Sequence, residues 1–155
     1  MRYTLLFFVL TLIIFSCSKN KFSSTPSLKF KSVNTTELHP QGVLNFALTF
    51  TDAEGDFSDS GSLYIQFMQR MLPSCTVSEN PATFALPVFP ATKDQKGTIN
   101  VSLSYGNITP QCSPLNDTTV FRFVLKDDAG HVSDTASSPT TVSYTHLTLP
   151  TNREV

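Results

Sequence analysis

The chain of 155 residues has no tryptophan, only six glycines, and 15% charged residues. Its formal net charge of −1 leaves no basic excess of the kind that nucleic-acid binding requires, so no nucleic-acid partner is expected. The sequence shows no helical period, no heptad pattern and no internal repeat. It also lacks the G-x-S-x-G and H-E-x-x-H motifs and a phosphate-binding glycine loop, so the sequence predicts that the protein is not an enzyme.

What the chain does contain favours short strands joined by turns. It has 13 phenylalanines and ten prolines, and serine and threonine are frequent. Apolar residues alternate with polar ones over residues 28–33, 43–50, 63–70 and 98–105. Residues 120–125 are apolar on both faces apart from Arg122 and predict a central strand. Residues 84–88, with Pro87 and Pro90, predict an edge strand, and 132–141 predicts a weak last strand. About seven strands predict a single all-β, immunoglobulin-like antiparallel β-sandwich, and the missing tryptophan excludes an antibody-type domain.

Two loop motifs support this fold. Residues 50–56 (FTDAEGD) resemble the D-x-x-G-D loop that follows the second strand in many exported bacterial sandwich domains. Residues 126–133 (KDDAGHVS) resemble the D-x-A-G-N-x-S turn after the penultimate strand, with His131 in place of asparagine. The resemblance is to the immunoglobulin-like (cadherin-like) domains of Gram-negative lipoproteins, and it implies a fold but no specific activity.

The N-terminal stretch MRYTLLFFVLTLIIFSC has the layout of an export signal, with Arg2 before a short apolar run and Ser16 before Cys17. The run is shorter than the roughly 20 apolar residues that span a bilayer. The end of the run resembles the lipobox of bacterial lipoproteins, which implies that 1–16 are removed and Cys17 is lipidated. An ordinary cleaved signal and an uncleaved anchor are the alternatives. Residues 17–27 are then the lipidated cysteine and a flexible tether, and 28–141 the domain.

Membrane attachment through this lipid implies a location in the cell envelope. Ser18 follows the cysteine where inner-membrane lipoproteins tend to carry aspartate, so the resemblance implies the outer membrane. A domain facing the periplasm and one facing outward both remain open.

The tail 142–155 (VSYTHLTLPTNREV) does not continue the strand pattern. Residues 142–151 resemble the translation of a transposon adapter used in sequencing libraries. We therefore interpret 142–155 as a non-native segment, with a genuine but poorly patterned last strand as the alternative. On the first interpretation the domain at 28–141 is possibly truncated.

Acidic residues in the loop after 43–50 are candidate metal ligands. Asp52, Glu54 and Asp56 alternate along it, with Asp59 nearby, and hard oxygen ligands at such spacing suit Ca²⁺. The EF-hand pattern fails, because Gly55 is at the wrong offset and Leu63 stands in place of the closing glutamate. The alternative is that these carboxylates, like Asp127 and Asp128, only cap turns.

Three further sites follow from the compartment and from short motifs. Cys75 and Cys112 lie in proline-containing loops and are predicted to form a disulfide, with two free thiols as the alternative. Thr118 and Thr135 stand in D-[ST]-x patterns that resemble acceptors for bacterial O-glycosylation. His39 and His131 have no nucleophile motif beside them and are not assigned a catalytic role.

The function we expect is that of a lipid-anchored, non-catalytic binding or structural module. Its ligand would be a protein or a glycan, contacted by loops such as 51–60 and 72–82. One alternative is an N-terminal spacer of a larger surface glycan-binding or adhesive protein. Another is a calcium-stabilised adhesive module.

Overall fold

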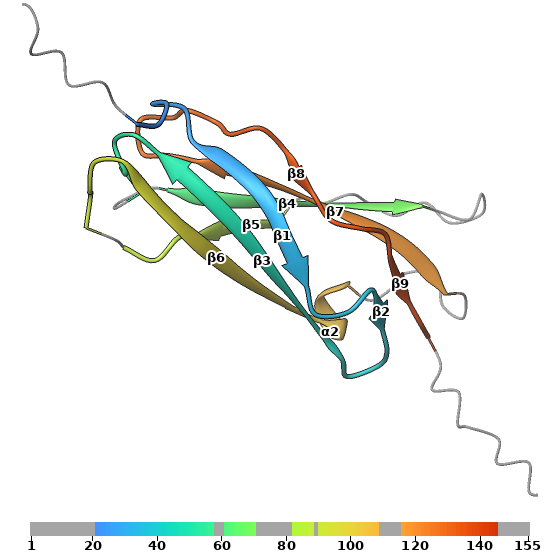
Figure 1. Ribbon diagram of the computed structural model, residues 1–155. Coiled ribbons are helices and arrows are strands. Elements are labelled where there is room, and N and C mark those ends of the chain that lie inside the picture. The colour runs from blue at the N-terminus through green and yellow to red at the C-terminus, as the bar shows by residue number, and fades with distance from the viewer. Residues whose placement is uncertain (1–20, 58–60, 71–81, 89, 109–115, 146–155) are drawn as a thin grey trace, which may run out of the picture.

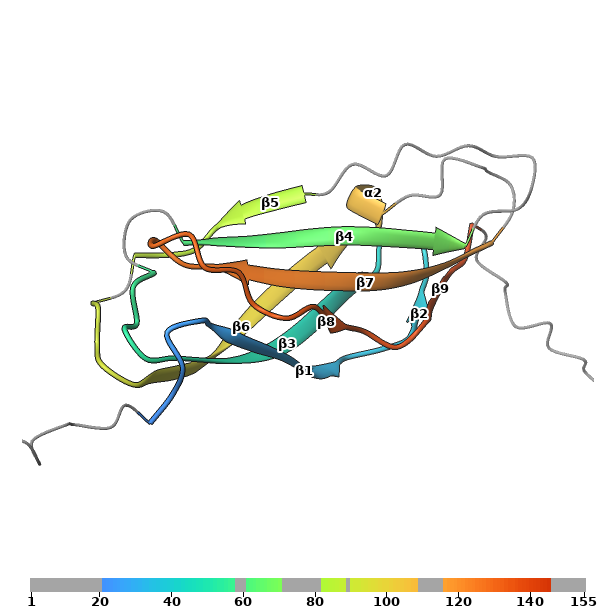
Figure 2. The same cartoon turned by 90° about the horizontal axis from the view of Figure 1, so that it is seen from above.

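The computed structural model describes residues 21–57, 61–70, 82–88, 90–108 and 116–145, and for 67–70 it describes the backbone only. These residues form an all-β sandwich of two sheets that face each other (Figures 1 and 2). In this part of the chain, no helix has the length and apolar character needed to cross a membrane.

The smaller sheet is antiparallel and has the order β1-β3-β6. Its strands are β1 (Ser27–Val33), β3 (Val43–Asp52) and β6 (Gln95–Ser104). The larger sheet has the order β2-β9-β7-β4-β5, with β8 paired to β7. Its strands are β2 (Glu37–Leu38), β4 (Ser62–Arg70), β5 (Ala82–Ala85), β7 (Asp117–Lys126), β8 (Ala136–Ser137) and β9 (Thr141–Ser143). A short helix, α2 (Tyr105–Ile108), follows β6.

The alternating pattern of the sequence produces the core. Four residues of β3 that alternate along the strand, Leu44, Phe46, Leu48 and Phe50, are all buried. The ring of Phe46 crosses to the other sheet, where its centroid lies 4.9 Å from that of Phe121 and 5.2 Å from that of Phe123. Tilted aromatic pairs at such distances are favourable beyond their buried area. These contacts hold β3 against β7, the central strands of the two sheets.

The first strand leaves the smaller sheet through a bulge and an asparagine. The register of β1 against β3 shifts between Phe30 and Ser32. Beyond the end of β1, the Asn34 side chain accepts from the Asn45 amide at 2.7 Å and donates to the Val43 carbonyl at 3.0 Å. Asn34 therefore replaces the next strand residue, and the chain can cross to the larger sheet as β2, which runs parallel to β9.

Most of the predicted strands are confirmed, and two predictions need correction. The observed strands overlap all the other predicted segments, although β5 ends at Ala85 within the predicted 84–88 and Tyr105 belongs to α2; β7 lies between β4 and β9 as expected of a central strand, and β5 is at an edge. The single strand predicted over 132–141 is wrong, because this segment contains only β8 and the start of β9. Nor did the sequence pattern indicate β2 or α2, which are too short to show a period.

Serine side chains explain why 132–141 is not one strand. The Ser133 hydroxyl accepts from the Leu125 amide at 2.9 Å, and the Ser138 hydroxyl accepts from the Phe121 amide at 3.0 Å. Each hydroxyl also donates to the carbonyl of the next residue along the chain. Side chains thus replace backbone partners on this edge of β7, on either side of the two-residue β8.

The two ends of the described chain lie at opposite ends of the sandwich (Figure 1). Residues 21–26 precede β1 at the end where β3 and β7 finish, which we call the entry pole. At the other end, the Val142 and Tyr144 amides donate to carbonyls of Thr36 and Leu38. Residues 142–145 therefore extend the larger sheet, and their non-native origin stays a prediction, because such pairing uses backbone groups that any sequence provides.

Buried hydroxyls in the larger sheet give a paired prediction for stability. Thr119 on β7 is 1% exposed, and its hydroxyl has no hydrogen-bond partner among the described residues. We expect Thr119→Val to raise the free energy of unfolding by about 1 kcal/mol, because valine has nearly the same shape as threonine but lacks the buried hydroxyl. Ser138→Ala should instead lower it by about 1–3 kcal/mol, because the Phe121 amide loses its acceptor. Urea unfolding of both variants tests this, and equal effects of the two substitutions would contradict it.

Candidate metal centre

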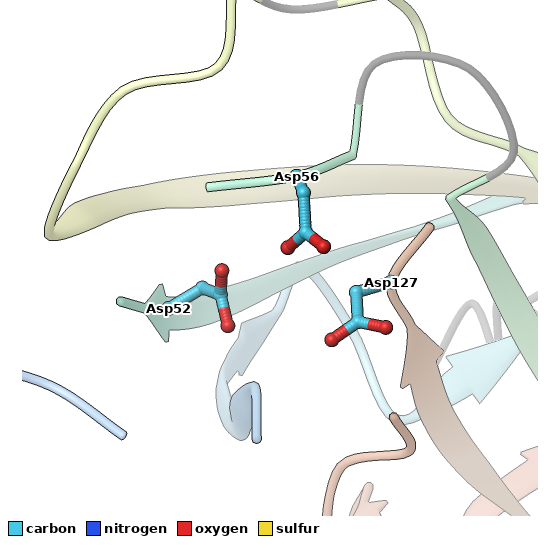
Figure 3. Close-up of side chains that lie close together, drawn as sticks. All are labelled: Asp52, Asp56 and Asp127. Carbon is cyan, nitrogen blue, oxygen red and sulfur yellow. The ribbon is translucent and has the colours of Figure 1, made fainter. Parts of the chain in front are cut away.

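Three aspartates from two distant parts of the chain meet at the entry pole. Asp52 is the last residue of β3, Asp56 lies four residues further on, and Asp127 follows β7 directly. One carboxylate oxygen of each lies within 4.8 Å of those of the other two, and the three side chains converge in Figure 3. Because β3 and β7 belong to different sheets, the packing of the sheets brings these groups together.

Asp52 is fully buried and serves the loop that follows it. Its Oδ2 accepts from the Gly55 amide at 2.6 Å, a bond that turns the chain back toward the strand end. Its Oδ1 is also buried and has no hydrogen-bond partner among the described residues. The charged form of such a carboxylate is energetically unfavourable, because it is buried without a full set of hydrogen-bond partners.

Gly55 allows the loop to close over the site. Its φ is +64°, in the left-handed region that favours glycine. A Cβ at this position would lie 2.3 Å from the Thr92 carbonyl oxygen and 2.8 Å from Gln95 Oε1. The loop therefore approaches the turn before β6 so closely that only glycine fits.

Substitution of this glycine tests the loop geometry. We expect Gly55→Ala to lower the free energy of unfolding by about 1–3 kcal/mol, because it adds backbone strain and a clash with a carbonyl. Gly106→Ala in α2 is the matched control, since a methyl group added there would have no heavy atom within 4 Å and alanine favours helix. Thermal unfolding of both variants measures the difference. A neutral Gly55→Ala would contradict the tight approach.

Asp127 organises the turn after β7. Its Oδ1 accepts from the His131 amide at 2.7 Å, and its Oδ2 lies 2.9 Å from His131 Nδ1. The Gly130 amide donates to the Asp127 carbonyl, and Gly130 itself has a φ of +91°. The neighbouring Asp128 amide donates to the Asp56 carbonyl at 2.8 Å, which joins this turn to the loop after β3.

Three side-chain oxygens at this pole are buried acceptors without a hydrogen-bond partner among the described residues. They are Asp52 Oδ1, Asp56 Oδ1 and Gln95 Oε1. Gln95 pairs with Asp52 across β6 and β3, so the two side chains leave the same face of the sheet. Buried acceptors normally have hydrogen-bond partners, so three such oxygens at one pole indicate that a further donor or a cation binds there.

Several carboxylates lie close to Asp52, and their like charges change its pKa. Burial raises the pKa of Asp52, and the charges of Asp56, Glu54 and Asp127 raise it further, while the Gly55 hydrogen bond lowers it. Between the pKa of Asp52 in the unfolded state and its higher pKa in the folded state, the folded protein binds the proton more tightly. Without a cation, the free energy of unfolding therefore falls as the pH rises through this range. Among the described residues, the basic side chain paired with Asp127 is that of His131, which is half exposed.

The predicted calcium ligands are found in part. Asp52 and Asp56 do come together, but Glu54 is exposed and is not a member of the cluster. The third carboxylate is Asp127, which the sequence assigned to turn chemistry. Since the second and penultimate strands of such a sandwich both end at one pole, the two acidic motifs that follow them could have indicated the pairing.

The other predicted site residues fall into two groups. Cys17, Cys75 and Cys112 lie outside the described residues. Of the two predicted glycosylation acceptors, Thr118 is half-buried inside β7 between Arg70 and Val142, whereas Thr135 is exposed in the segment before β8. The accessibility that glycan attachment requires is therefore met better at Thr135.

His39, which the sequence did not assign to a site, stacks on Tyr144 at the far pole, with ring centroids 4.7 Å apart.

Chemically, this arrangement offers a small cage of hard oxygen atoms. The three carboxylates suit Ca²⁺, which takes six to eight oxygen ligands and accepts irregular geometry, and the buried oxygen of Gln95, which pairs with Asp52, is a candidate fourth ligand. The side-chain nitrogen that contacts this cluster, His131 Nδ1, is already engaged by Asp127. The donor set therefore favours calcium over a metal that prefers nitrogen or sulfur ligands.

Comparisons with known proteins give no family. No family model matches the chain, and no curated protein matches it. Among solved structures, the sporulation control protein Spo0M of Bacillus subtilis is similar over 79% of this chain and 50% of its own, with 9% identity and a TM-score of 0.43. The alkylpurine DNA glycosylase AlkC of Pseudomonas fluorescens is similar over 85% and 33%, with 10% identity and a TM-score of 0.44.

A β-glucosidase of Listeria innocua is similar over 77% of this chain and 16% of its own, with 15% identity and a TM-score of 0.38. The chain thus spans half or less of the length of each of these proteins. Likeness at this level says nothing about activity. The structure itself establishes an all-β sandwich with an acidic cluster at the pole where the chain enters.

Proposed function

We propose that this protein is an exported, lipid-anchored and non-catalytic β-sandwich module whose entry pole binds Ca²⁺. The observation that carries the calcium site is the convergence of Asp52, Asp56 and Asp127, with buried oxygens that have no hydrogen-bond partner among the described residues. A divalent cation would supply the positive charge that this cage lacks. It would also fix the loop after β3 to the turn after β7.

The geometry supports a stabilising role over hydrolysis. Glycosidases place two carboxyl groups about 5–9.5 Å apart on either side of the bond that is cleaved. Here the converging oxygens lie within 4.8 Å of one another, and Asp52 and Asp127 are at most 1% exposed. A cage this close and this buried suits an ion better than a glycosidic bond. The loops around it would then be the contact surface for a protein or glycan ligand.

Anchoring through Cys17 is the second part of the proposal. It is supported by the apolar run that ends at Ser16 and Cys17 in the sequence. Several acyl chains on one residue give stable attachment, since each buried methylene contributes about 0.8 kcal/mol. By resemblance, the membrane is the outer one, and the domain faces the periplasm or the exterior.

A calcium titration with charge-neutral variants tests the site. We expect millimolar Ca²⁺ to raise the melting temperature of the protein over that in chelator, because the ion binds the folded state alone. Asp52→Asn should abolish this rise, yet should raise the melting temperature in chelator by a few degrees, because it removes one of three crowded charges. Calorimetric titration with Ca²⁺ gives the affinity directly.

Two acidic positions provide the controls. Glu54→Gln changes the same loop outside the cluster and should keep the calcium response. Asp117 lies at the start of β7, and burial raises its pKa, so Asp117→Asn should stabilise the protein equally in calcium and in chelator. An unchanged melting temperature on adding Ca²⁺ to the unaltered protein would refute the proposed site.

The anchor is tested separately from the metal. We expect the unaltered protein to incorporate labelled fatty acid and Cys17→Ala to abolish this labelling, because the acyl chains can no longer be attached. Mass spectrometry of the mature N-terminus of the unaltered protein provides an independent readout. An unaltered protein that carries no fatty acid and still begins at Met1 would instead indicate an uncleaved anchor.

A second candidate function is a spacer in a larger surface glycan-binding or adhesive protein. The observation that favours it is the position of the chain ends at opposite poles, an arrangement that suits modules joined in line. Calcium at the entry pole would then stiffen the junction between the spacer and its N-terminal anchor, and the rest of the larger protein would follow from the other pole. This candidate differs from the first in the partner, and both use the same cation site.

A further inference from the structure

Residues 21–26 form a strap that lies against the entry pole before β1 begins. The Lys21 and Phe22 amides donate to Asp94 Oδ1 at 2.8 and 3.2 Å. The Ser23 carbonyl accepts from the Ala53 amide at 3.0 Å. The sequence predicted a flexible tether over 17–27, but residues 21–23 are held by these three bonds.

The strap and the acidic cage share one loop. Ala53 directly follows Asp52 and is 2% exposed. Its amide holds Ser23, and its carbonyl accepts from the Asp94 amide at 2.8 Å. Asp94 in turn holds Lys21 and Phe22, so each of the strap's three bonds depends on the position of Ala53. That position is set by Asp52 on one side and by Gly55 and Asp56 on the other.

Asp94 holds the strap from a left-handed turn. Its φ is +54°, a conformation that aspartate and asparagine adopt more often than other residues with a side chain. The conformation lies in the turn before β6, next to Gln95, whose side-chain oxygen faces Gly55. The clamp on the strap and a candidate ligand of the cage are thus adjacent residues.

We propose that the cation site and the strap form one cooperative unit, in which a divalent cation held by Asp52, Asp56 and Asp127 strengthens the docking of residues 21–26. Without a cation, repulsion among the three carboxylates favours a looser loop at 53–56, and Ala53 holds Ser23 and Asp94 less firmly. With a cation, the loop is fixed and the strap docks. The inference rests on the proposed cation site and adds a consequence that the site alone does not require.

The consequence concerns the distance between the domain and the membrane. Cys17 precedes Lys21 by four residues, which reach about 14 Å at full extension. With the strap docked, a lipid on Cys17 keeps the entry pole close to the bilayer surface. Release of residues 21–26 would add about 20 Å of reach at the same extension per residue. Calcium would therefore set how far, and in what orientation, the module stands from its anchor.

Coupling must be reciprocal, which makes it measurable from both ends. If calcium strengthens strap docking by some factor, loss of the docked strap must weaken calcium binding by the same factor. The variant to use is Asp94→Gly, which removes the carboxylate and tolerates the positive φ, so that it should still fold. Asp94→Asn keeps an acceptor oxygen in the same place and should restore most of the effect. Glu37→Gln, at β2 in the other pole, is the control for loss of one negative charge.

The experiment combines amide exchange with calorimetry on the purified full chain, with calcium chloride as the only added ligand. We expect Ca²⁺ to slow exchange of the Lys21 and Phe22 amides about fivefold or more, a typical coupling factor. We expect Asp94→Gly to abolish that protection and to raise the calcium dissociation constant by a similar factor, while Glu37→Gln changes neither.

The outcomes separate the two proposals. If Ca²⁺ binds by calorimetry but the Lys21 and Phe22 amides exchange at the same rate with and without it, the coupling is overturned and the cation site stands. If Asp94→Gly frees the strap and leaves the dissociation constant unchanged, the coupling is likewise overturned. If no Ca²⁺ binds, both the proposed site and the coupling fall.

Discussion

The contact on which the structure depends is that between Phe46 of β3 and the two phenylalanines of β7. It joins the central strands of the two sheets, and it fixes where each strand ends relative to the other. Asp52 and Asp127 follow from that alignment, since one ends β3 and the other comes directly after β7. The acidic cage is therefore a product of sheet packing, and burial of the phenylalanine rings offsets the repulsion among its charges.

The acidic cluster of the described chain lies at the entry pole. This pole combines buried acceptors that have no hydrogen-bond partner among the described residues, three residues with a positive φ that close the loops, and a carboxylate clamp on the incoming chain. The other pole also has buried oxygens without such a partner, but they are the uncharged hydroxyls of Thr119, Thr141 and Ser143. The difference in charge between these two sets of buried oxygens favours the entry pole as the place for a cation.

On the side of β7 that faces away from β4, the larger sheet continues with two short strands, β8 and β9. A continuous last strand would have satisfied every amide there, but two serine hydroxyls and two short strands do so instead. Such side-chain bonds can form wherever serine falls at the right position, so they leave no alternating pattern in the sequence. This is why a single strand was predicted over 132–141 and two fragments were observed.

Most of the fold could be predicted from the sequence, because strands in a sandwich bury every second residue and the period of two is visible in β3, β4 and β6. The candidate site could be predicted only in part. Asp52 and Asp56 are close in sequence, so their loop was recognisable, and Glu54 was included because spacing alone cannot show that it points outward. The sequence by itself thus determined the strands and the acidic loop. Asp127 could have been added from the strand order, but only the tertiary structure could add Gln95 and the clamp of Asp94 on the strap, because these contacts join residues that are far apart along the chain and meet only in the folded sheet.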